Sequence, residues 1–301
     1  MRARLLPFLV LGTGVAVVSF ASILIRLAQA EGASSLTISA VRLSLASLVL
    51  APVVWTRTRS EILQLGRREL GLCVLSGFFL SLHFWTWITS LEYTSVASSA
   101  ALVTTNPLWV ALVSALWLRE RPGRFAMIGI ALSIVGSTLI FAGDAGAPSA
   151  SASEPLLGNT LALAGAVFAS GYLLVGRALR SRISLLAYVW LAYTAAAILL
   201  LLGAGVAGTT AEVLSPMAWT LMILLALGPQ LIGHTTFNWA LRRMSATFVA
   251  VAILGEPIGS SVLAYLLLGE SFNAAQLSGF VILLVGIFVA AGGERLREEN
   301  N

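Results

Sequence analysis

The chain has 301 residues, of which 58% are hydrophobic and only 10% are charged, and its mean hydropathy is +0.93. A soluble domain carries about 25% charged residues, and a soluble core of this size cannot bury so much apolar surface, so the composition predicts an integral membrane protein. The same composition excludes disordered, fibrous and nucleic-acid-binding classes, although the isoelectric point is about 10.1. We therefore expect the lipid bilayer, and no nucleic acid, as a partner.

The thiol and basic residues exclude several kinds of chemistry. The single cysteine, Cys73, cannot build a disulfide framework or a Cys-rich metal site. All 18 basic residues are arginine, whereas a Walker A phosphate loop and a Schiff base to a cofactor both need lysine. We therefore expect no ATP-driven pump, no cofactor and no bound metal.

Ten stretches of the chain are apolar over roughly the 20 residues that a membrane-spanning helix needs. In chain order they are Leu5–Ala28, Ser34–Trp55, Leu70–Ser90, Thr94–Leu118, Phe125–Ala142, Pro155–Gly176, Ile183–Val206, Pro216–Leu241, Ser245–Leu267 and Ala274–Ala291. The sequence thus predicts an all-α membrane protein with ten transmembrane helices.

The arginines predict the orientation, because cytoplasmic loops carry an excess of positive charge. With the N-terminus in the cytoplasm, 16 of the 18 arginines fall on the inner side. The outer connections then carry acids instead, namely Glu31, Glu92, Asp144, Glu154, Glu212 and Glu270. We predict a multi-pass protein of the inner or plasma membrane with both termini in the cytoplasm.

The first thirty residues also imitate a secretory signal peptide. Arg2 and Arg4 precede an apolar run, and Ala28-Gln29-Ala30 follows it like a cleavage site. However, the apolar run is long for such a peptide, and its removal would reverse the arginine alternation. The run is therefore interpreted as the first span.

The two halves of the chain resemble each other at an offset of 150 residues. The matches are Leu91 and Ser95 with Leu241 and Ser245, Asn106-Pro107 with Glu256-Pro257, Glu120 with Glu270, and Gly129 and Gly136 with Gly279 and Gly286. Each half holds five spans, and an odd number turns the second half upside down relative to the first, as in secondary transporters. The prediction is two inverted five-helix repeats, at 1–142 and 155–292, with an outer linker at 143–154 and a cytoplasmic tail at 293–301.

Taken together, these features make the sequence resemble a known family. The five-plus-five pattern, the prolines midway in the fourth and ninth spans, and the endings Leu116–Glu120 and Leu266–Glu270 are similar to the EamA type of the drug/metabolite transporter superfamily. The resemblance implies export of amino acids, other metabolites or drugs through a central cavity. That cavity would lie mainly between the third, fourth, eighth and ninth helices, with the fifth and tenth at the periphery. Glu120 and Glu270 resemble structural marks of the family, and we assign them no role in transport.

Two ionisable residues at membrane depth are candidate site residues, because a charge is costly there. Glu256, near the middle of the ninth span, could exchange a proton near neutral pH, or it could satisfy backbone amides freed by the kink at Pro257. Arg42, deep in the second span, could hold a substrate carboxylate, pair with Glu256, or cap carbonyl groups between helices. It shares one helix face with Ser35 and Ser39, and we favour a structural pairing. 

Polar stripes mark the eighth and third spans. Gln230, His234 and Asn238 recur at four-residue spacing in the eighth span, and we expect this stripe to face water or substrate. In the third span His83 and Trp87 have the same spacing, although Trp87, like Trp85 and Trp109, also suits the aromatic belt of a membrane protein.

Three further features complete the sequence-based expectations. Asn106, before Pro107, is the symmetric mate of Glu256, so a helix break at both places would expose carbonyl groups to a cavity. Arg26 lies near the outer end of the first span, where we expect it to extend to the interface. Small residues in the fifth and tenth spans are expected to pack within the fold, and the chain is expected to be a monomer or a homodimer.

These observations predict a secondary transporter and not an enzyme. The expected function is export of a small-molecule substrate, such as an amino acid, by alternating access around a midplane cavity lined by the candidate residues. One alternative is an intramembrane enzyme with His83 or His234 as its base, but the sequence lacks a nucleophile motif. The other is a passive channel, for which an inverted two-half design is unusual.

Overall fold

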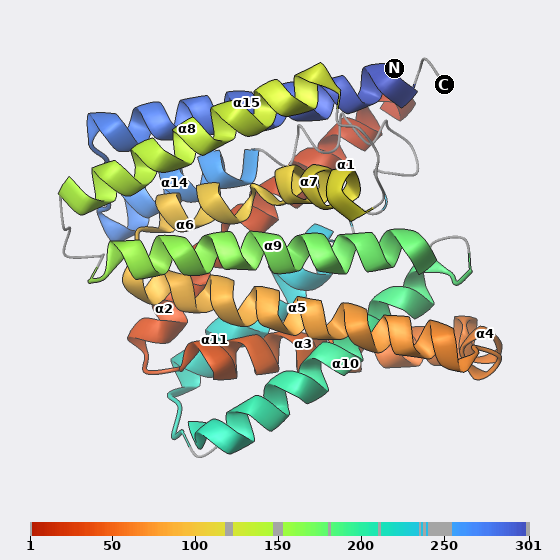
Figure 1. Ribbon diagram of the computed structural model, residues 1–301. Helices are drawn as coiled ribbons and strands as arrows, with labels where there is room; N and C mark the ends of the chain where they lie inside the picture. Colours follow the sequence, from red (N-terminus) through yellow and green to blue (C-terminus); the bar gives the residue numbers. More distant parts are fainter. Residues whose placement is uncertain are drawn as a thin grey trace.

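The described part of the protein is built of helices alone. The computed structural model describes residues 2–117, 123–146, 153–179, 182–209, 212–234, 236, 239 and 255–298. No strand occurs in these ranges, so the prediction of an all-α protein is confirmed for them. The long helices run side by side as a bundle, and α1 begins at the end of the bundle where α15 ends (Figure 1).

The helices of the first half are α1 (Arg2–Ser19), α2 (Ala21–Ala30), α3 (Ser35–Arg57), α4 (Arg59–Leu63), α5 (Arg67–Tyr93), α6 (Val96–Val103), α7 (Asn106–Trp117) and α8 (Arg124–Gly146), which continues into the predicted linker. Those of the second half are α9 (Pro155–Leu179), α10 (Leu185–Ala207), α11 (Pro216–Leu225), the π-helix η2 (Ala226–Gly233), α14 (Gly255–Leu268) and α15 (Ala274–Glu298).

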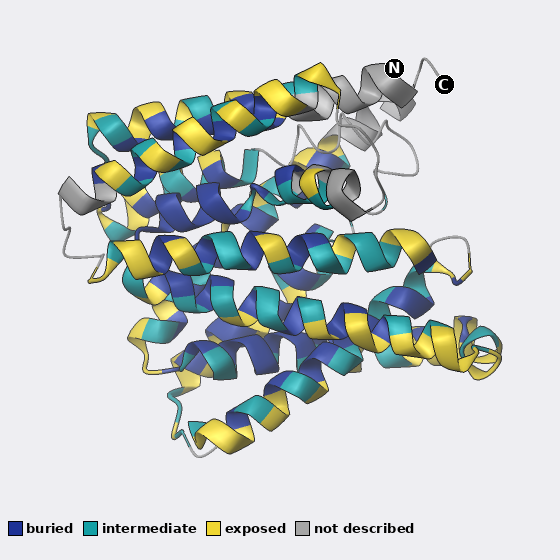
Figure 2. Ribbon diagram, in the orientation of Figure 1, coloured by how far each residue is buried: buried dark blue, intermediate teal, exposed yellow. Residues whose placement is uncertain are grey.

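Six described helical segments are long and apolar enough to cross a membrane. They are Leu9–Ala30, Ser35–Arg57, Arg67–Tyr93, Pro155–Leu179, Leu185–Ala207 and Pro216–Gly233, and three shorter apolar helices follow at Met127–Gly143, Gly255–Leu268 and Ala274–Val289. The predicted fourth span is divided into α6 and α7, and the predicted ninth span lies partly outside the described residues, so the count of ten stays a prediction. Exposed residues lie on the outward faces of the helices and buried ones gather between them (Figure 2), and many of the exposed side chains are apolar, as a lipid-facing surface requires.

Serine caps define where several helices begin. The side chains of Ser34, Ser95, Ser184 and Ser215 each accept a hydrogen bond from the backbone N–H three residues later, at the start of α3, α6, α10 and α11. Such a cap satisfies one of the N–H groups that a helix start leaves without a partner. In a membrane protein this matters because lipid offers no hydrogen bond in exchange.

The small residues of the fifth and tenth spans pack against each other, as the sequence predicts. A Cβ atom on Gly136 would lie 2.6 Å from the backbone nitrogen of Leu283, and one on Gly279 would lie 2.7 Å from the carbonyl oxygen of Gly136. A Cβ atom on Gly286 would meet the carbonyl oxygen of Gly129 at 2.8 Å. Glycine therefore lets α8 and α15 approach at backbone distance, as in other membrane helix pairs.

The expectation that Arg26 simply extends to the interface is wrong. Its guanidinium donates to the carbonyl oxygen of Leu91, and its Nη2 lies 3.8 Å from Oε1 of the buried Glu270. Both carboxylate oxygens of Glu270 also accept from the backbone N–H of Val96, at 3.0 Å each. Glu270 therefore joins α2 to the start of α6, which agrees with the structural role that the family resemblance implies. Glu120 lies outside the described residues.

We expect Glu270→Ala to lower the free energy of unfolding by about 1–3 kcal/mol, because it leaves the buried N–H of Val96 without its acceptor. Thermal or denaturant unfolding in detergent measures this change. Glu154→Ala is the matched control, since Glu154 is exposed and its side chain makes no hydrogen bond or ion pair within the described ranges. Equal stability of the two variants would show that the Glu270 contacts do not support the fold.

Candidate functional site

The candidate site is centred on a buried arginine. Arg42 lies in α3, whose predicted polar face is buried as expected: Ser39 is 0% exposed and Arg42 is 1% exposed. Ser39 is satisfied within its own helix, where its hydroxyl donates to the carbonyl oxygen of Ser35 at 2.7 Å. Arg42 instead extends away from α3, and its Nε donates to Oε1 of Gln230 at 2.7 Å. This bond joins the second predicted span to the eighth.

The acceptor Gln230 lies in the π-helix η2 and not in an α-helix. Pro229 has no N–H to donate, and the helix around it widens over Ala226–Gly233. A π-helical stretch inside a longer helix is frequent at functional sites, because it redirects side chains and frees backbone groups. The four-residue spacing used to predict the stripe assumes a regular α-helix, whereas Gln230 is fully buried against Arg42, and His234 is half-buried just after η2. Asn238 lies outside the described residues.

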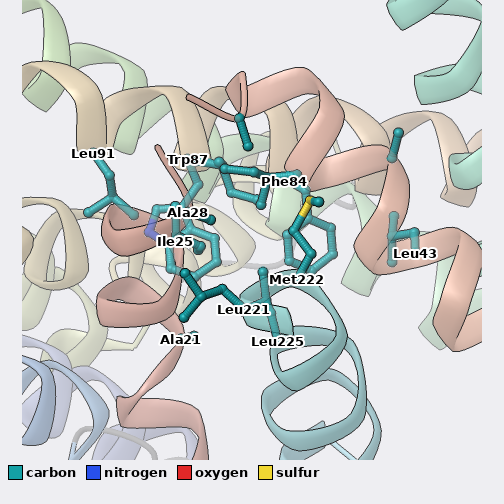
Figure 3. Close-up of a cluster of buried hydrophobic side chains, with 14 of the residues drawn as sticks. Ala21, Ile25, Ala28, Leu43, Phe84, Trp87, Leu91, Leu221, Met222 and Leu225 are labelled. Atoms are coloured by element: carbon teal, nitrogen blue, oxygen red, sulfur yellow. The ribbon is translucent and has the colours of Figure 1, made fainter. Parts of the chain in front are cut away.

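Aromatic side chains of α5 form the wall of the site. The guanidinium carbon of Arg42 lies 4.3 Å from the centre of the Phe84 ring and 5.7 Å from that of Trp87. Both are cation–π distances, which stabilise a buried cation. Figure 3 shows Phe84 and Trp87 side by side in the buried apolar cluster, near Met222 and Leu225 of α11. Sequence reasoning missed Phe84, because a phenylalanine in a membrane helix carries no signal of its own.

His83 stands beside this wall in a defined state. Its Nδ1 lies 2.9 Å from the carbonyl oxygen of Gly165 in α9, and its ring stacks on Trp87 with an interplanar angle of 8°. Because a carbonyl oxygen only accepts, Nδ1 carries the proton, and Nε2 of a neutral His83 is left as an acceptor. Trp87 is 4% exposed, so the alternative that it belongs to the aromatic belt is wrong; Trp85, which is 45% exposed, faces outward.

Helix breaks surround the site. α6 ends at Val103 and α7 begins at Asn106, so the predicted break in the fourth span is present, and the Asn106 carbonyl oxygen accepts from Ser170 of α9 at 2.9 Å. The first span is also broken, between α1 and α2, next to Ser19. The sequence gives no proline or glycine signal at that position.

Glu256 stands in the first turn of α14, next to the break in the first span. Ser19 donates to the carbonyl oxygen of Glu256 at 3.4 Å, and Ser260 donates to that of Ser19 at 3.1 Å. Within the described ranges the carboxyl group of Glu256 accepts no hydrogen bond and forms no ion pair within 4 Å. The predicted ion pair between Glu256 and Arg42 is therefore not formed in this structure.

The fold nevertheless brings most of the predicted residues together. The charge of Arg42 acts electrostatically on Glu256, His83 and His234, and together with Arg42 these residues come from four different predicted spans. The buried Tyr193 of α10, which sequence reasoning also missed, interacts with the Gln230 side chain. The described ranges hold no group of three metal-ligating side chains. The arrangement is a small polar centre with aromatic walls.

A separate apolar cavity of about 490 Å³ lies between α7, α8 and α9, and the residues that line it include Trp109, Phe141, Leu163 and Ser133. Trp109 donates to the hydroxyl of Thr105 at 3.1 Å at one edge. None of the predicted site residues lines this cavity, so it is distinct from the Arg42 centre.

Comparison with known proteins decides the family. The sequence profile of the EamA-like transporter family matches residues 6–142 and residues 156–292, nearly the whole chain. The chain belongs to the EamA-like transporter family. It is accordingly a multi-pass membrane transporter, and this family membership favours transport over the alternative of an intramembrane enzyme.

Relatives agree with this placement. An uncharacterized transporter of Clostridium kluyveri is 24% identical over 250 residues, which span 81% of this chain and 79% of that protein. An uncharacterized transporter of Synechocystis is 23% identical over 214 residues, which span 70% of this chain and 63% of that protein. A protein of known crystal structure has the same fold, with a TM-score of 0.63 at 20% identity over 96% of this chain and 98% of its own.

We expect cysteines placed at residues 230 and 234, in a Cys73→Ser background, to react with a small water-requiring thiol reagent, since a transport site must be open to water in part of the cycle. Labelling is measured in intact membranes. Met222→Cys is the control for a buried apolar position in the same span. If residues 230 and 234 label no faster than residue 222, the stripe serves packing and the substrate path lies elsewhere.

Proposed function

We propose that this transporter is a secondary-active exporter of small amphipathic metabolites such as amino acids, working by alternating access around the Arg42 centre. The observation that carries the proposal is the Arg42–Gln230 hydrogen bond. It places a buried charge between the two halves of the chain, beside helix breaks and aromatic side chains, where the family resemblance implies a cavity.

The packing supports two equivalent halves. α3 and α10 both begin and end 150 residues apart, and α8 and α15 begin 150 residues apart. Contacts between the halves also occur in matching pairs: α5 packs on α9 as α1 packs on η2, and α7 packs on α9 as α1 packs on α14. With the five spans predicted for each half, such a pairing supports an inverted repeat.

Polar contacts between the halves lie at both ends of the bundle. At the predicted outer end, Ser34 N donates to Glu212 at 3.2 Å and Ser215 donates to Glu31 at 2.6 Å. At the predicted inner end, Arg182 pairs with Glu69 at 2.9 Å. Exposed contacts of this kind are worth about 0–1 kcal/mol each. The weakness of these exposed contacts supports alternating access, in which one end opens while the other stays closed. The buried Glu270 also joins the halves, through Arg26 and Val96.

Glu256 is the residue to which we assign energy coupling. Its carboxyl group is not used to satisfy backbone N–H groups of the described residues, which argues against a purely structural role. It is half-buried and senses the charge of Arg42. Binding or release of a proton at Glu256 would therefore change the balance of charge at the substrate centre.

We expect Glu256→Gln to abolish uphill transport and its pH dependence while leaving expression and thermal stability near normal, because glutamine keeps the size and hydrogen-bonding capacity of the side chain but cannot ionise. Solute accumulation in proteoliposomes under an imposed pH gradient measures this. Glu154→Gln, an exposed position away from the centre, is the control. Normal pH-dependent accumulation by Glu256→Gln would rule out coupling through this residue.

We expect both termini to face the cytoplasm. A fluorescent protein fused after residue 301 should fluoresce, and alkaline phosphatase fused there should be inactive. As a control, phosphatase inserted within the predicted linker at 143–154 should be active, because the linker is predicted to lie outside. The opposite pattern of phosphatase activity would overturn the predicted topology.

A further inference from the structure

Two hydrogen-bond donors at the Arg42 centre have no acceptor. Nη1 of Arg42 and Nε1 of Trp87 are both buried, and neither has a hydrogen-bond partner in the described part of the chain. The two residues are 1% and 4% exposed. They come from different helices, α3 and α5, yet the guanidinium carbon of Arg42 lies 5.7 Å from the centre of the Trp87 ring.

A buried donor without an acceptor is costly, so folded proteins rarely retain one. Two such donors on neighbouring side chains, one of them charged, point to a place where a ligand supplies the acceptor. Nε of Arg42 is already held by Gln230, which fixes the plane of the guanidinium and directs its Nη atoms. The centre is therefore preorganised to receive an acceptor.

The chemistry of the two donors selects the ligand. A guanidinium and a neutral indole N–H together provide one positive charge and two donors, which match the two oxygens and single negative charge of a carboxylate. A phosphate dianion would bring a second negative charge, and the chain has no lysine to balance it. The neighbouring Phe84 ring, 4.3 Å from the guanidinium, covers the site with an apolar surface.

We propose that Nη1 of Arg42 and Nε1 of Trp87 together bind the carboxylate of the substrate, so that the transporter selects solutes carrying a carboxylate next to an apolar group. This inference rests on the proposed function, since it names the substrate class at the same centre. Trp87 then acts as a specificity residue and not only as part of the wall. His83 acts as a positioning residue, because it stacks on Trp87 and is itself held by Gly165.

Matched acids and amides test this directly in the purified full-length protein. The probes are 3-phenylpropionate with 3-phenylpropanamide, hexanoate with hexanamide, and phenylalanine with phenylalaninamide, measured by equilibrium binding in detergent or nanodiscs. We expect each acid to bind about 10–100-fold more tightly than its amide, the range for hydrogen bonds to a charged group. Equal affinity of acids and amides, or binding of no acid at millimolar concentration, would overturn the inference.

Conservative variants assign the preference to the two donors. Trp87→Phe removes the N–H and keeps an aromatic ring, so it should lower the acid-to-amide preference about 10-fold without changing amide binding. Arg42→Gln should remove the preference. Trp85→Phe, on the same helix but facing outward, is the matched control. Unchanged preference in Trp87→Phe or Arg42→Gln would contradict the assignment, and amide binding shows that each variant is folded.

A spectroscopic readout does not depend on transport or on the folding of Arg42→Gln. In protein labelled with ¹⁵N-indole tryptophan, the resonance that disappears in Trp87→Phe is that of Trp87 Nε1–H. It should move downfield when 3-phenylpropionate is added and stay unchanged with 3-phenylpropanamide. A resonance that does not respond to the acid would overturn the proposed contact.

Transport assays separate failure of this inference from failure of the proposed function. If proteoliposomes accumulate solutes against a gradient but those solutes lack a carboxylate, the carboxylate site is wrong and the transporter stands. If acids bind with the expected preference but no solute moves uphill, the binding site stands and secondary-active transport is wrong.

Discussion

The charge of Arg42, buried inside a membrane protein, is the constraint on which the centre of this structure depends. An ion inside a low-dielectric interior is stable only when polar and polarisable groups replace its lost water. The fold supplies these from several elements: Gln230 from η2, and Phe84 and Trp87 from α5. The requirement to compensate one guanidinium thus brings together helices from both halves of the chain.

This compensation is incomplete, and the incompleteness has a function in our interpretation. Nε of Arg42 is satisfied by Gln230, whereas Nη1 has no partner among the residues that the structure describes. A fully satisfied arginine would serve packing alone. An arginine with an unpaired N–H donor, buried among aromatic side chains, forms a strong charge-assisted hydrogen bond only when an anionic group binds. Binding energy of this kind can be used to bias one conformation of a transporter over another.

Small residues determine how closely the two halves approach this centre. A Cβ atom on Gly165 would lie 3.2 Å from Trp87 Cβ, so glycine at this position lets α9 approach α5 closely, and the Gly165 carbonyl oxygen reaches His83. At the periphery the glycines of α8 and α15 fit backbone against backbone. Lipid provides little hydrophobic drive for helix association, so van der Waals contact at such close approaches takes its place.

The sequence by itself determined the class, the helical fold and much of the residue set. Apolar runs and charge content identify a membrane protein, because lipid leaves a chain few ways to satisfy its backbone. The buried polar face of α3 and the break before Asn106 also follow from local pattern, since helical spacing and proline act within a few residues.

Only the tertiary structure decided which side chains meet. Arg42 pairs with Gln230 and not with Glu256, Trp87 lies inside and not in the interfacial belt, and Arg26 reaches Glu270. These contacts join helices far apart in the sequence, and the contact with Gln230 also depends on the widened turn at Pro229. A pattern with a period of 3.6 residues describes one regular helix, so it predicts neither the contacts between distant helices nor the widened turn.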